Sequence, residues 1–503
     1  MTPIRGSADV GSGLAPARDA RPISEGERIH VVGAGGAGAS AAALLAHHRG
    51  ASVSGCDPGG PSPYTPPLVS AGIHLDWMHS AAHVNGVPPP DRLAVTKALT
   101  AVDPNNAELV AARAAAIPLE PWQQVIADAA VGKTLVGVAG THGKSTSSGW
   151  LVHVLTEAGL DPIAFVGALL PGRLTGGLPS TVRWGQGAPF VVEADEYAGN
   201  FDPYRPDLAI LTSAEWDHPD VFADRAAVVD CFATWLERAA VTVAQPVLVA
   251  NVGEEGVAEV VGRLRGWPGL VHEISLATGT WESEPFLVGT ILAAESGGTT
   301  LRMEGAALAS PGIARLRLAG RHNAANALGV AGAALALGVA PDVLMAALGS
   351  FDGVGRRLER KGEGRGVVVY DDYGHHPTAI RETLAALRQL EPRRRVWAVY
   401  EPLTYHRTAA MLEEFAAVLA TADAVAIADI WAGRDPDTTI VSAAALAEAT
   451  ARRRPGLTAV APGSVEQTAD WLARSVRPGD AVLVMGGGKS YRIAELLLEA
   501  LSE

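Results

Sequence analysis

The sequence predicts an α/β protein of several domains built around mainly parallel sheets. Short apolar segments rich in β-branched residues alternate along the chain with longer segments of helical periodicity, which is the pattern of parallel sheets. Glycine-rich turns join a predicted strand to a predicted helix at residues 33–38 and again at residues 140–146. With 503 residues, of which 48% are hydrophobic, the chain is long enough for roughly two to four domains with large cores.

Composition limits the classes of function and location. The net charge of −14 argues against a general nucleic-acid binder, because affinity for a phosphate backbone needs dense Lys and Arg. The sequence shows no apolar run of transmembrane length and no signal peptide. Its two cysteines, Cys56 and Cys231, have neither a disulfide framework nor metal-ligand spacing, and they suit a reducing compartment. We therefore expect a cytoplasmic protein with no nucleic-acid or membrane partner.

Residues 1–26 are predicted to be a disordered tail. They are rich in Gly, Pro, Ala, Ser and Arg and show no periodicity. The Asp and Glu residues among them weaken a targeting role.

The first glycine-rich turn has the GxGxxG spacing of a dinucleotide-binding loop, between a strand at residues 29–32 and a helix at residues 41–47. Its glycines are Gly33, Gly35, Gly36 and Gly38. The next strand, at residues 51–55, ends near Asp57, where a Rossmann unit carries the acid that holds a ribose hydroxyl. The motif fits any pyrophosphate ligand, including NAD, FAD and UDP-sugars. A tight strand–helix turn without a ligand is the alternative.

The second glycine-rich turn predicts a phosphate-binding loop. A buried strand at residues 134–139 leads into it, and a helix at residues 145–158 follows. The turn consists of Gly140, Thr141, His142, Gly143, Lys144, Ser145 and Thr146. Its glycines let backbone N–H groups crowd a phosphate, and the helix N-terminus adds positive potential. Lys144 can reach the terminal phosphates, and Ser145 can ligate Mg²⁺.

The spacing of this turn departs from the common P-loop. Two residues rather than four separate Gly140 and Gly143, so a tight connection with no ligand is the alternative. The strand, the Lys-Ser-Thr run and the helix are all in register, which favours the phosphate interpretation.

Acidic residues follow two predicted strands after the P-loop. They are Glu193, Asp195 and Glu196 after the strand at residues 189–193, and Glu215, Asp217 and Asp220, with His218, after the strand at residues 208–212. Ligands of α/β sheets bind at the carboxyl ends of strands, so this edge is the natural place for a Mg²⁺ ligand beside a P-loop. The alternatives are a solvated run of charge and a structural His218.

A long Ala/Leu helix begins after Gly320 and carries Asn323 and Asn326 on one face of its first turn. The two amides are either N-terminal caps or groups that recognise a base. Residues 240–318 are Gly-rich with short β-like stretches, and no chemistry is assigned to them.

A third α/β unit has predicted strands at residues 366–370, 396–400, 424–428 and 481–485. Polar residues gather after these strands, at the edge where a parallel sheet binds ligands. Among these polar residues, Arg407 and His375 are the best candidates for a site residue, because an anionic substrate needs a fixed cation.

Taken in this order, the motifs resemble those of the ATP-dependent Mur ligases, from about Ile29 to the C-terminus. The matching residues are the two glycine-rich turns, Glu193-Ala-Asp-Glu196, Asp217-His218-x-Asp220, Gly320-x-His-Asn-x-x-Asn326, Arg356-Arg357, Asp371-Asp-Tyr-Gly-His-His-Pro-Thr378 and Tyr405-x-Arg407-Thr408. The resemblance implies three domains after the tail. These are a Rossmann-like UDP-sugar domain at residues 27–130, a P-loop ATPase domain at residues 131–354 and a Rossmann-like domain for amino acid and nucleotide at residues 355–503.

The resemblance also implies a reaction and a set of site residues. The reaction is ligation of L-alanine to the lactyl carboxylate of UDP-N-acetylmuramate through an acyl phosphate, with ATP and Mg²⁺, in peptidoglycan precursor synthesis. The implied catalytic residues are Lys144, Glu193, His218, His375 and Arg407, and the implied Mg²⁺ ligands are Ser145, Glu193 and His218. The implied ATP contacts are Gly140 to Thr146, Asn323, Asn326, Arg357 and Asp372. The implied substrate contacts are Gly33, Gly35, Gly36, Gly38 and Asp57 for the UDP-sugar, and Tyr373, His375 and Arg407 for the amino acid.

Several positions depart from the usual pattern of the family. Ser145 stands where Thr is common, Thr212-Ser213 replaces Thr-Asn, Glu401-Pro-Leu403 replaces Gln-Pro-His, and Gly487-Gly-Lys489 replaces an Ala-Gly-Asp-like run. Residues 193–197 and 204–206 are also similar to a related Mur ligase that recycles a murein tripeptide. A murein tripeptide or another amino acid is therefore the alternative amine. Outside this class, the alternatives are an NAD-dependent oxidoreductase and a nucleotide-binding regulatory protein without catalysis.

Overall fold

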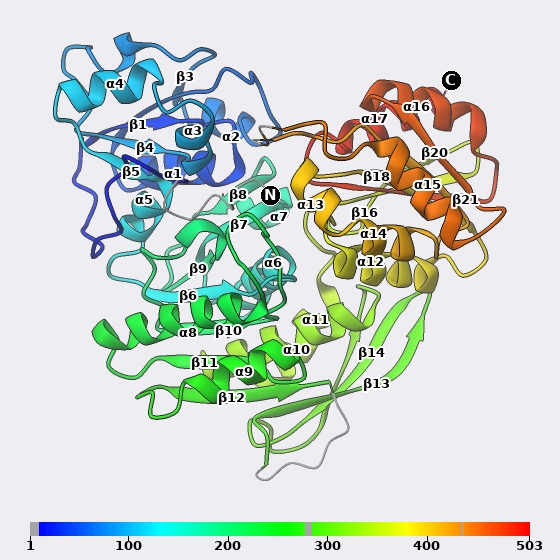
Figure 1. The fold of residues 1–503 in the computed structure, drawn as a ribbon. Helices are drawn as coiled ribbons and strands as arrows, with labels where there is room; N and C mark the ends of the chain where they lie inside the picture. Colours follow the sequence, from blue (N-terminus) through cyan, green and yellow to red (C-terminus); the bar gives the residue numbers. More distant parts are fainter. Residues whose placement is uncertain (1–9, 277–283, 434, 436, 503) are drawn as a thin grey trace.

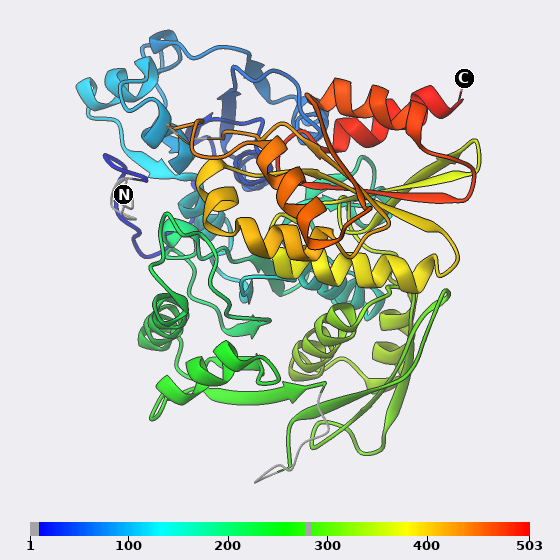
Figure 2. The ribbon, with the colours of Figure 1, turned by 45° about the vertical axis from the view of Figure 1, so that its right-hand side comes forward.

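Three α/β regions follow one another along the chain, each built around its own sheet, in a computed structural model that describes residues 10–276, 284–433, 435 and 437–502. The N-terminal region, blue to cyan in Figure 1, and the C-terminal region, yellow to red, both lie against the green central region. Figure 2 shows the same arrangement from a second direction. The predicted α/β fold with mainly parallel sheets is confirmed.

The N-terminal region has a parallel sheet of five strands in the order β3-β2-β1-β4-β5. Its strands are β1 (Arg28–Val32), β2 (Ser52–Cys56), β3 (His74–Asp76), β4 (Arg92–Val95) and β5 (Leu119–Pro121). Its helices are α1 (Ala37–His48), α2 (Pro66–Ser70), η1 (Ala81–His83), α3 (Lys97–Val102), α4 (Ala107–Ala114) and α5 (Trp122–Ala129). Helix α1 is apolar on nearly every side, and its Ala and Leu side chains are accordingly buried in the core.

The central region has a sheet of ten strands in the order β15-β14-β13-β12-β11-β10-β6-β9-β7-β8. The strands are β6 (Thr134–Ala139), β7 (Ile163–Leu170), β8 (Ser180–Arg183), β9 (Pro189–Glu193), β10 (Leu208–Leu211), β11 (Val247–Asn251), β12 (Leu270–Ser275), β13 (Leu287–Glu295), β14 (Gly298–Glu304) and β15 (Gly312–Leu316). The helices are α6 (Lys144–Glu157), α7 (Gly172–Thr175), η2 (Tyr197–Gly199), α8 (Arg225–Thr242), α9 (Glu255–Arg263), α10 (Arg321–Ala336) and α11 (Pro341–Ser350). Strand β6 lies in the middle of the sheet, so its buried, β-branched side chains place the glycine-rich turn that follows at the centre of one sheet edge.

The C-terminal region has a sheet of six strands in the order β16-β17-β21-β18-β19-β20, parallel except for β16. The strands are β16 (Glu359–Gly364), β17 (Val367–Asp372), β18 (Arg395–Glu401), β19 (Ala424–Ala428), β20 (Thr458–Gly463) and β21 (Asp480–Gly486). The helices are α12 (Pro377–Leu390), α13 (Tyr405–Ala410), α14 (Leu412–Leu419), α15 (Ala443–Arg453), α16 (Val465–Ser475) and α17 (Tyr491–Ser502). Two apolar clusters, one on each face of this sheet, form its core.

The stretch at residues 240–318, to which the sequence gives no chemistry, extends the central sheet. Strands β13, β14 and β15 pair antiparallel at its edge. The hairpin of β13 and β14 reaches the C-terminal region, where Gln389 Nε2 donates to the carbonyl of Gly298 at 2.8 Å (Figure 1). Within the described part of the chain, no helix has the length and apolar content needed to cross a membrane.

The predicted disorder of residues 1–26 is wrong for residues 10–26, which lie along the N-terminal region with fixed contacts. The guanidinium of Arg18 donates to Glu120 at 2.8 Å and to Asp128 at 2.7 Å. The segment shows no periodicity because individual side-chain contacts, rather than a helix or a strand, fix its course. The residues before Val10 lie outside the described residues.

The same segment ties the N-terminal region to the central region. Val10 is buried against Tyr197 and Ala198 of the central region. The ammonium of Lys97, which belongs to the N-terminal region, donates to the carbonyl of Ala198 at 2.7 Å. Both contacts converge on η2, which is one of the places where the two regions meet; helix α1 also packs against β7 and β8 of the central region.

A buried arginine holds several acids of the N-terminal region together. Arg92 on β4 has a side chain that is 1% exposed. Its guanidinium pairs with Glu27 at 3.0 Å, with Glu120 at 2.7 Å and also with Asp128. Arg18 and Arg21 also pair with these acids, but from more exposed positions, so removing the charge of Arg92 leaves the carboxylates without their only buried cation among these partners, which is more costly than losing an exposed ion pair.

Replacing Arg92 by Met is expected to lower the free energy of local opening around β1 and β4 by about 3 kcal/mol, because one partner of a buried ion network is lost. The measurement is amide hydrogen exchange followed by mass spectrometry on peptides that cover these strands, which reports local rather than global unfolding.

The matched control is Arg28→Met. The side chain of Arg28 pairs with Asp91 nearby, but the two side chains are 39% and 42% exposed. This exposed pair is expected to contribute less than about 1 kcal/mol. Equal effects of the two substitutions would contradict the role given to Arg92.

Candidate active site

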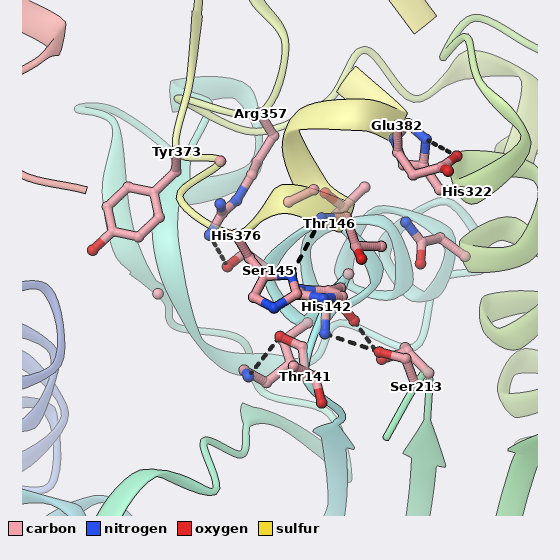
Figure 3. Close-up of a pocket in the computed structure, with 18 of the residues that line it drawn as sticks. Thr141, His142, Ser145, Thr146, Ser213, His322, Arg357, Tyr373, His376 and Glu382 are labelled. Carbon is pink, nitrogen blue, oxygen red and sulfur yellow. Dashed lines mark hydrogen bonds and ion pairs between the residues drawn. The ribbon is translucent and has the colours of Figure 1, made fainter. Parts of the chain in front are cut away.

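A cavity of about 750 Å³ lies where the three regions meet, and strand carboxyl ends and the loops that follow them form much of its wall. Figure 3 shows part of this wall. The predicted site residues that line the cavity are Gly38, Thr141, His142, Gly143, Lys144, Ser145, Thr146, Glu193, His218, Asn323, Asn326, Arg357, Asp372, Tyr373 and His375. Those that do not line it are Gly33, Gly35, Gly36, Asp57, Gly140 and Arg407.

The ammonium group of Lys144 is held by carboxylates of the central region. Nζ donates to Glu196 Oε2 at 2.9 Å and to the carbonyl of Gly140 at 2.6 Å, and it lies 3.7 Å from Asp195 Oδ1. Burial alone lowers the pKa of Lys144, but the charges of Glu196 and Asp195 outweigh it and raise the pKa. Lys144 is therefore a fixed positive charge at the start of α6, where a phosphate would lie.

Ser145 joins the P-loop to both an acid and an arginine. Its Oγ donates to Glu193 Oε1 at 2.9 Å and accepts from Arg357 Nη2 at 2.8 Å. The second oxygen of Glu193 accepts the backbone N–H of Gly167 at 2.6 Å. Two of the three predicted Mg²⁺ ligands, Ser145 and Glu193, are thus adjacent. Arg357 comes from the C-terminal region, so its contact also connects that region to the P-loop (Figure 3).

The third predicted metal ligand, His218, lies with a different pair of acids. Ligand atoms of His218, Asp195 and Glu196 are all within 4.8 Å of one another, an arrangement that could hold a metal ion. Glu193 is not a member of that cluster. The structure therefore brings Ser145 to Glu193, and His218 to the two acids that also face Lys144.

Arg407 lies behind His218, away from the cavity wall. Its Nη2 donates to Asp217 Oδ1 at 2.7 Å and lies 3.1 Å from His218 Nδ1. Both Arg407 and Asp217 are buried. Burial lowers the pKa of Arg407, but the Asp217 carboxylate outweighs it and raises the pKa. Arg407 is thus a cation from the C-terminal region that positions His218.

His375 is not the fixed cation that the sequence predicts. Burial, together with the charge of Arg407, lowers the pKa of His375 well below its ordinary value, so the ring is neutral at pH 7. Its Nδ1 lies 3.0 Å from the carbonyl of Tyr373. A carbonyl can only accept, so Nδ1 carries the proton and Nε2 is left as a proton acceptor.

Side chains that follow β10 hold the P-loop in place. The backbone N–H of Glu215 donates to Thr141 Oγ1 at 2.9 Å, and that of His142 donates to Ser213 Oγ at 2.9 Å. The ring of His142 lies 3.2 Å from the Glu215 carboxylate and 4.8 Å, centroid to centroid, from the ring of His376. Sequence reasoning missed Ser213 and His376 as supports of the loop. Their position directly after strands β10 and β17 was the available signal.

Asn323 and Asn326 are not helix caps. The N-cap of α10 is Gly320, which makes no side-chain cap hydrogen bond. Asn323 Nδ2 instead donates to the carbonyl of Ala319 at 2.8 Å, and Asn326 Nδ2 donates to Asn323 Oδ1 at 3.2 Å. Burial lowers the pKa of neighbouring His322 to about 4, so its ring is neutral at pH 7. Two amides beside a neutral ring suit a nucleotide base.

The carboxylate of Asp372 shapes the loop that carries Tyr373. Its oxygens accept the backbone N–H groups of Leu358 and Gly374, both at 2.7 Å. The ring of Tyr373 lies 4.8 Å from the guanidinium carbon of Arg357, a cation–π contact. These contacts fix Tyr373 and Arg357 side by side on the cavity wall (Figure 3).

The first glycine-rich turn is closed by contacts of its own. Asp57 Oδ2 accepts the backbone N–H of Gly35 at 2.9 Å, and Asp57 Oδ1 accepts that of Gly59 at 2.8 Å. A methyl group on Gly38 would lie 2.2 Å from the ring of Trp122, so only glycine lets α1 approach α5 this closely. Gly38 and Trp122 both line the cavity.

The fold and the site together define a P-loop nucleotide-binding protein whose cavity is shared by three α/β regions. Three segments of the chain match models of one family. They are the "Mur ligase family, catalytic domain" at residues 28–134, the "Mur ligase middle domain" at residues 138–334 and the "Mur ligase, glutamate ligase domain" at residues 356–488.

Curated relatives match almost the whole chain. A UDP-N-acetylmuramate–L-alanine ligase of Mycobacterium sp. (strain JLS) is 35% identical over 480 residues, which covers 94% of this chain and 95% of the relative. One of Kineococcus radiotolerans is 36% identical over 485 residues, covering 95% of this chain and 96% of the relative. The chain belongs to the Mur ligase family, and the resemblance inferred from its motifs is confirmed.

Solved structures share the fold. A UDP-N-acetylmuramate–alanine ligase of Thermotoga maritima superposes with a TM-score of 0.75 at 23% identity, covering 94% of this chain and 98% of that one. A murein peptide ligase of Psychrobacter arcticus has a TM-score of 0.71 at 24% identity, covering 95% and 99%. The three-domain architecture is thus confirmed, while the domain limits at residues 27–130, 131–354 and 355–503 stay predictions.

Replacing Gly143 by Ala is expected to weaken binding of a non-hydrolysable ATP analogue at least tenfold, or about 1.4 kcal/mol. Gly143 has a φ of +80°, and an added methyl would lie 2.4 Å from Asn326 Oδ1. Both the P-loop and Asn326 must therefore move. Isothermal titration calorimetry on the full chain measures the affinity.

Gly132 provides the matched control, because it has the same φ of +80° but no atom within 4 Å of an added methyl. Gly132→Ala is expected to cost about 1–2 kcal/mol of stability through backbone strain and to leave the nucleotide affinity unchanged. Equal affinity losses in the two variants would show that strain, rather than the contact with Asn326, is responsible.

Proposed function

We propose that the chain is an ATP-dependent, ADP-forming ligase that joins L-alanine to the lactyl carboxylate of UDP-N-acetylmuramate in peptidoglycan precursor synthesis. The proposal rests on one observation: the P-loop and side chains of both other regions line the same cavity. Relatives named for this reaction are 35% and 36% identical over nearly their full length. ATP is a cytoplasmic metabolite, so we place the reaction in the cytoplasm.

The reaction has two steps. The lactyl carboxylate attacks the γ-phosphate of ATP, which gives an acyl phosphate and ADP. The amine of L-alanine then attacks the acyl carbon, and phosphate leaves. The first step brings two anions together, and Lys144 supplies a positive charge at the place where they meet.

The second step needs a neutral amine. His375 is uncharged at pH 7 and keeps Nε2 as a proton acceptor on the cavity wall. Its pKa is too low for it to deprotonate an ammonium group, so in the proposed reaction the amine loses its proton to solvent and Nε2 accepts a hydrogen bond from the neutral amine. Tyr373 and Arg357, fixed beside it, orient the substrate groups.

The residues of the site fit Mg²⁺. Ser145 Oγ and Glu193 Oε1, 2.9 Å apart, offer the oxygen ligands that Mg²⁺ prefers, and the acids around His218 offer more. Ser145 and Glu193 would hold the ion, which when bound would neutralise charge on the phosphates, whereas His218 lies with Asp195 and Glu196 in a separate cluster.

The amine pocket favours a small apolar side chain. Leu403 lines the cavity where the family has a histidine. The carboxylate of Glu401 accepts the backbone N–H of Ser490 at 2.7 Å, so it stabilises a loop and is not free to bind an amine. Leu403 suits a methyl group beside the reacting amine better than the hydroxymethyl group of serine.

Replacing Lys144 by Ala is expected to lower the rate of ADP release at least about 100-fold, since a preorganised charge contact contributes about 3–4 kcal/mol to lowering the barrier. Binding of UDP-N-acetylmuramate, measured by calorimetry, is expected to survive. A coupled assay for ADP with both substrates present measures the rate.

Lys133→Ala is the matched control. Lys133 precedes β6, at the end of the strand opposite the P-loop, and its ammonium donates to the carbonyl of Gly187 at 2.7 Å. Its removal is expected to leave the rate unchanged. Near-normal turnover by Lys144→Ala would discredit the assignment of the P-loop.

Phosphate release with UDP-N-acetylmuramate and each of alanine, glycine, serine and a murein tripeptide tests the proposed substrate. We expect kcat/KM to be higher for L-alanine than for glycine or serine, because Leu403 offers an apolar wall for the methyl group. We expect it to be higher than for the tripeptide as well, because the relatives at 35% and 36% identity are named for L-alanine. A higher kcat/KM for the tripeptide would show that the amine substrate is the tripeptide and not L-alanine, while the family stays the same. An absorbance change of reduced nicotinamide without phosphate release would favour an oxidoreductase.

A further inference from the structure

Four side chains from separate parts of the N-terminal region meet in a cluster: His30 on β1, Cys56 at the end of β2, His83 in η1 and Glu108 in the first turn of α4. We name these four residues the N-terminal cluster. One ligand atom from each lies within 4.8 Å of all the others. None of the four lines the cavity of the active site. The sequence shows no metal-ligand spacing for these residues because they come from segments that are far apart in the chain.

The distances in the N-terminal cluster are close to those around a tetrahedral zinc ion. Cys56 Sγ lies 3.2 Å from both carboxylate oxygens of Glu108, and His30 Nε2 lies 3.7 Å from Glu108 Oε1. His83 Nδ1 also contacts Glu108. Zinc bonds of about 2.1 Å to N or O and about 2.3 Å to S place tetrahedral ligands about 3.4–3.6 Å apart. An ion could therefore enter with small side-chain movements.

Both histidines of the cluster are held by the ring nitrogen that faces away from it. His83 Nε2 lies 3.0 Å from Asp76 Oδ2, and His30 Nδ1 lies 2.8 Å from Ser54 Oγ. Metal-ligating histidines are oriented in this way, with the outer nitrogen bonded to a carboxylate or another polar group. The inner nitrogens, His83 Nδ1 and His30 Nε2, are left to face the centre of the cluster.

The inner nitrogen of His30 gives an independent indication of a ligand. The side chain is 3% exposed, and Nε2 has no hydrogen-bond partner. Buried polar atoms without a partner are rare in native proteins and call for an explanation such as a bound ion. The network around Glu108 gives hydrogen bonds to His83 and to His79, whose Nδ1 lies 3.1 Å from Glu108 Oε2, but His30 Nε2 lies 3.7 Å from Glu108 Oε1 and makes no hydrogen bond.

We propose that the N-terminal cluster binds a Zn²⁺ ion through His30 Nε2, Cys56 Sγ, His83 Nδ1 and a carboxylate oxygen of Glu108. Imidazole, thiolate and carboxylate together suit an ion of borderline softness with a tetrahedral preference. On binding, the thiol of Cys56 releases its proton to solvent and the Zn–S bond replaces the hydrogen bond from Sγ to Glu108. His79, 17% exposed and 3.3 Å from Cys56 Sγ, offers the ion a route from solvent.

The ion would brace the first glycine-rich turn. The backbone N–H groups of Gly33 and Ala34 donate to the carbonyl of Cys56 at 2.9 and 3.0 Å. Four protein ligands make a closed, structural site rather than a catalytic one. Zinc loading is therefore expected to raise the melting temperature of the protein.

The test uses the full chain, stripped of metal with a chelator and titrated with Co²⁺, which reports thiolate ligation by a charge-transfer band in the near ultraviolet. We expect about one equivalent of Co²⁺ to produce this band and Zn²⁺ to displace it. Cys56→Ser should abolish the band and weaken Co²⁺ binding at least about tenfold. Cys231→Ser, the matched control, should change neither. Clusters of the active site that contain only nitrogen and oxygen ligands, such as His142, Glu215 and His376, give no thiolate band.

Two outcomes would overturn the proposal: no thiolate band at saturating Co²⁺, or a band that persists in Cys56→Ser. His83→Gln keeps a polar group next to Asp76 and removes one ligand, and it serves as a second variant if Cys56→Ser does not fold. Affinity of His83→Gln equal to that of the unchanged protein would also count against the site. Each readout is independent of ligase activity, so it is unaffected if the proposed reaction is wrong.

Discussion

The ion pair between Lys144 and Glu196 is the interaction on which the site depends. Glu196 is 1% exposed, so a carboxylate there needs a cation, and Lys144 needs a countercharge. The pair links the first residue of α6 to the loop after β9, and these two elements set the shape of the P-loop. A phosphate that approaches Lys144 competes with Glu196 and Asp195 for the same ammonium. The excess of acid at this edge offers oxygen ligands of the kind that a divalent cation prefers.

Two arginines of the C-terminal region pair with groups of the central region near the P-loop. Arg357 contacts Ser145, and Arg407 contacts Asp217 and lies next to His218. The packing of the C-terminal region against the central one thus places positive charge beside the acids of the P-loop edge. Any ligand that takes over these partners changes the contacts that hold the regions together, so ligand binding and the placement of the regions are linked.

Local sequence was enough to predict the parts of the fold that local chemistry dictates. Strands β6, β9 and β19 begin and end as expected, because short apolar segments bounded by turn residues leave little choice. The P-loop residues were also visible as a contiguous motif. The contacts that could not be predicted are those between residues far apart in the chain. Arg357 and Ser145 are separated by 212 positions, and no spacing rule joins them.

Burial and non-local contacts account for the remaining differences. The charge of His375 could not be read from its residue type, because desolvation in the folded chain makes it neutral. The order of residues 10–26 depends on acids more than a hundred positions away: Arg18 finds Glu120 and Asp128 across separations of 102 and 110 positions. The two glycine-rich turns also differ in how much their own side chains can contribute to a ligand. The first contains only Gly and Ala between β1 and α1, whereas the second carries Lys144 and Ser145. A ligand at the first turn must therefore be held by backbone N–H groups and by residues of other elements, and the contacts of Cys56 and Asp57 that fix this turn matter more than its own side chains.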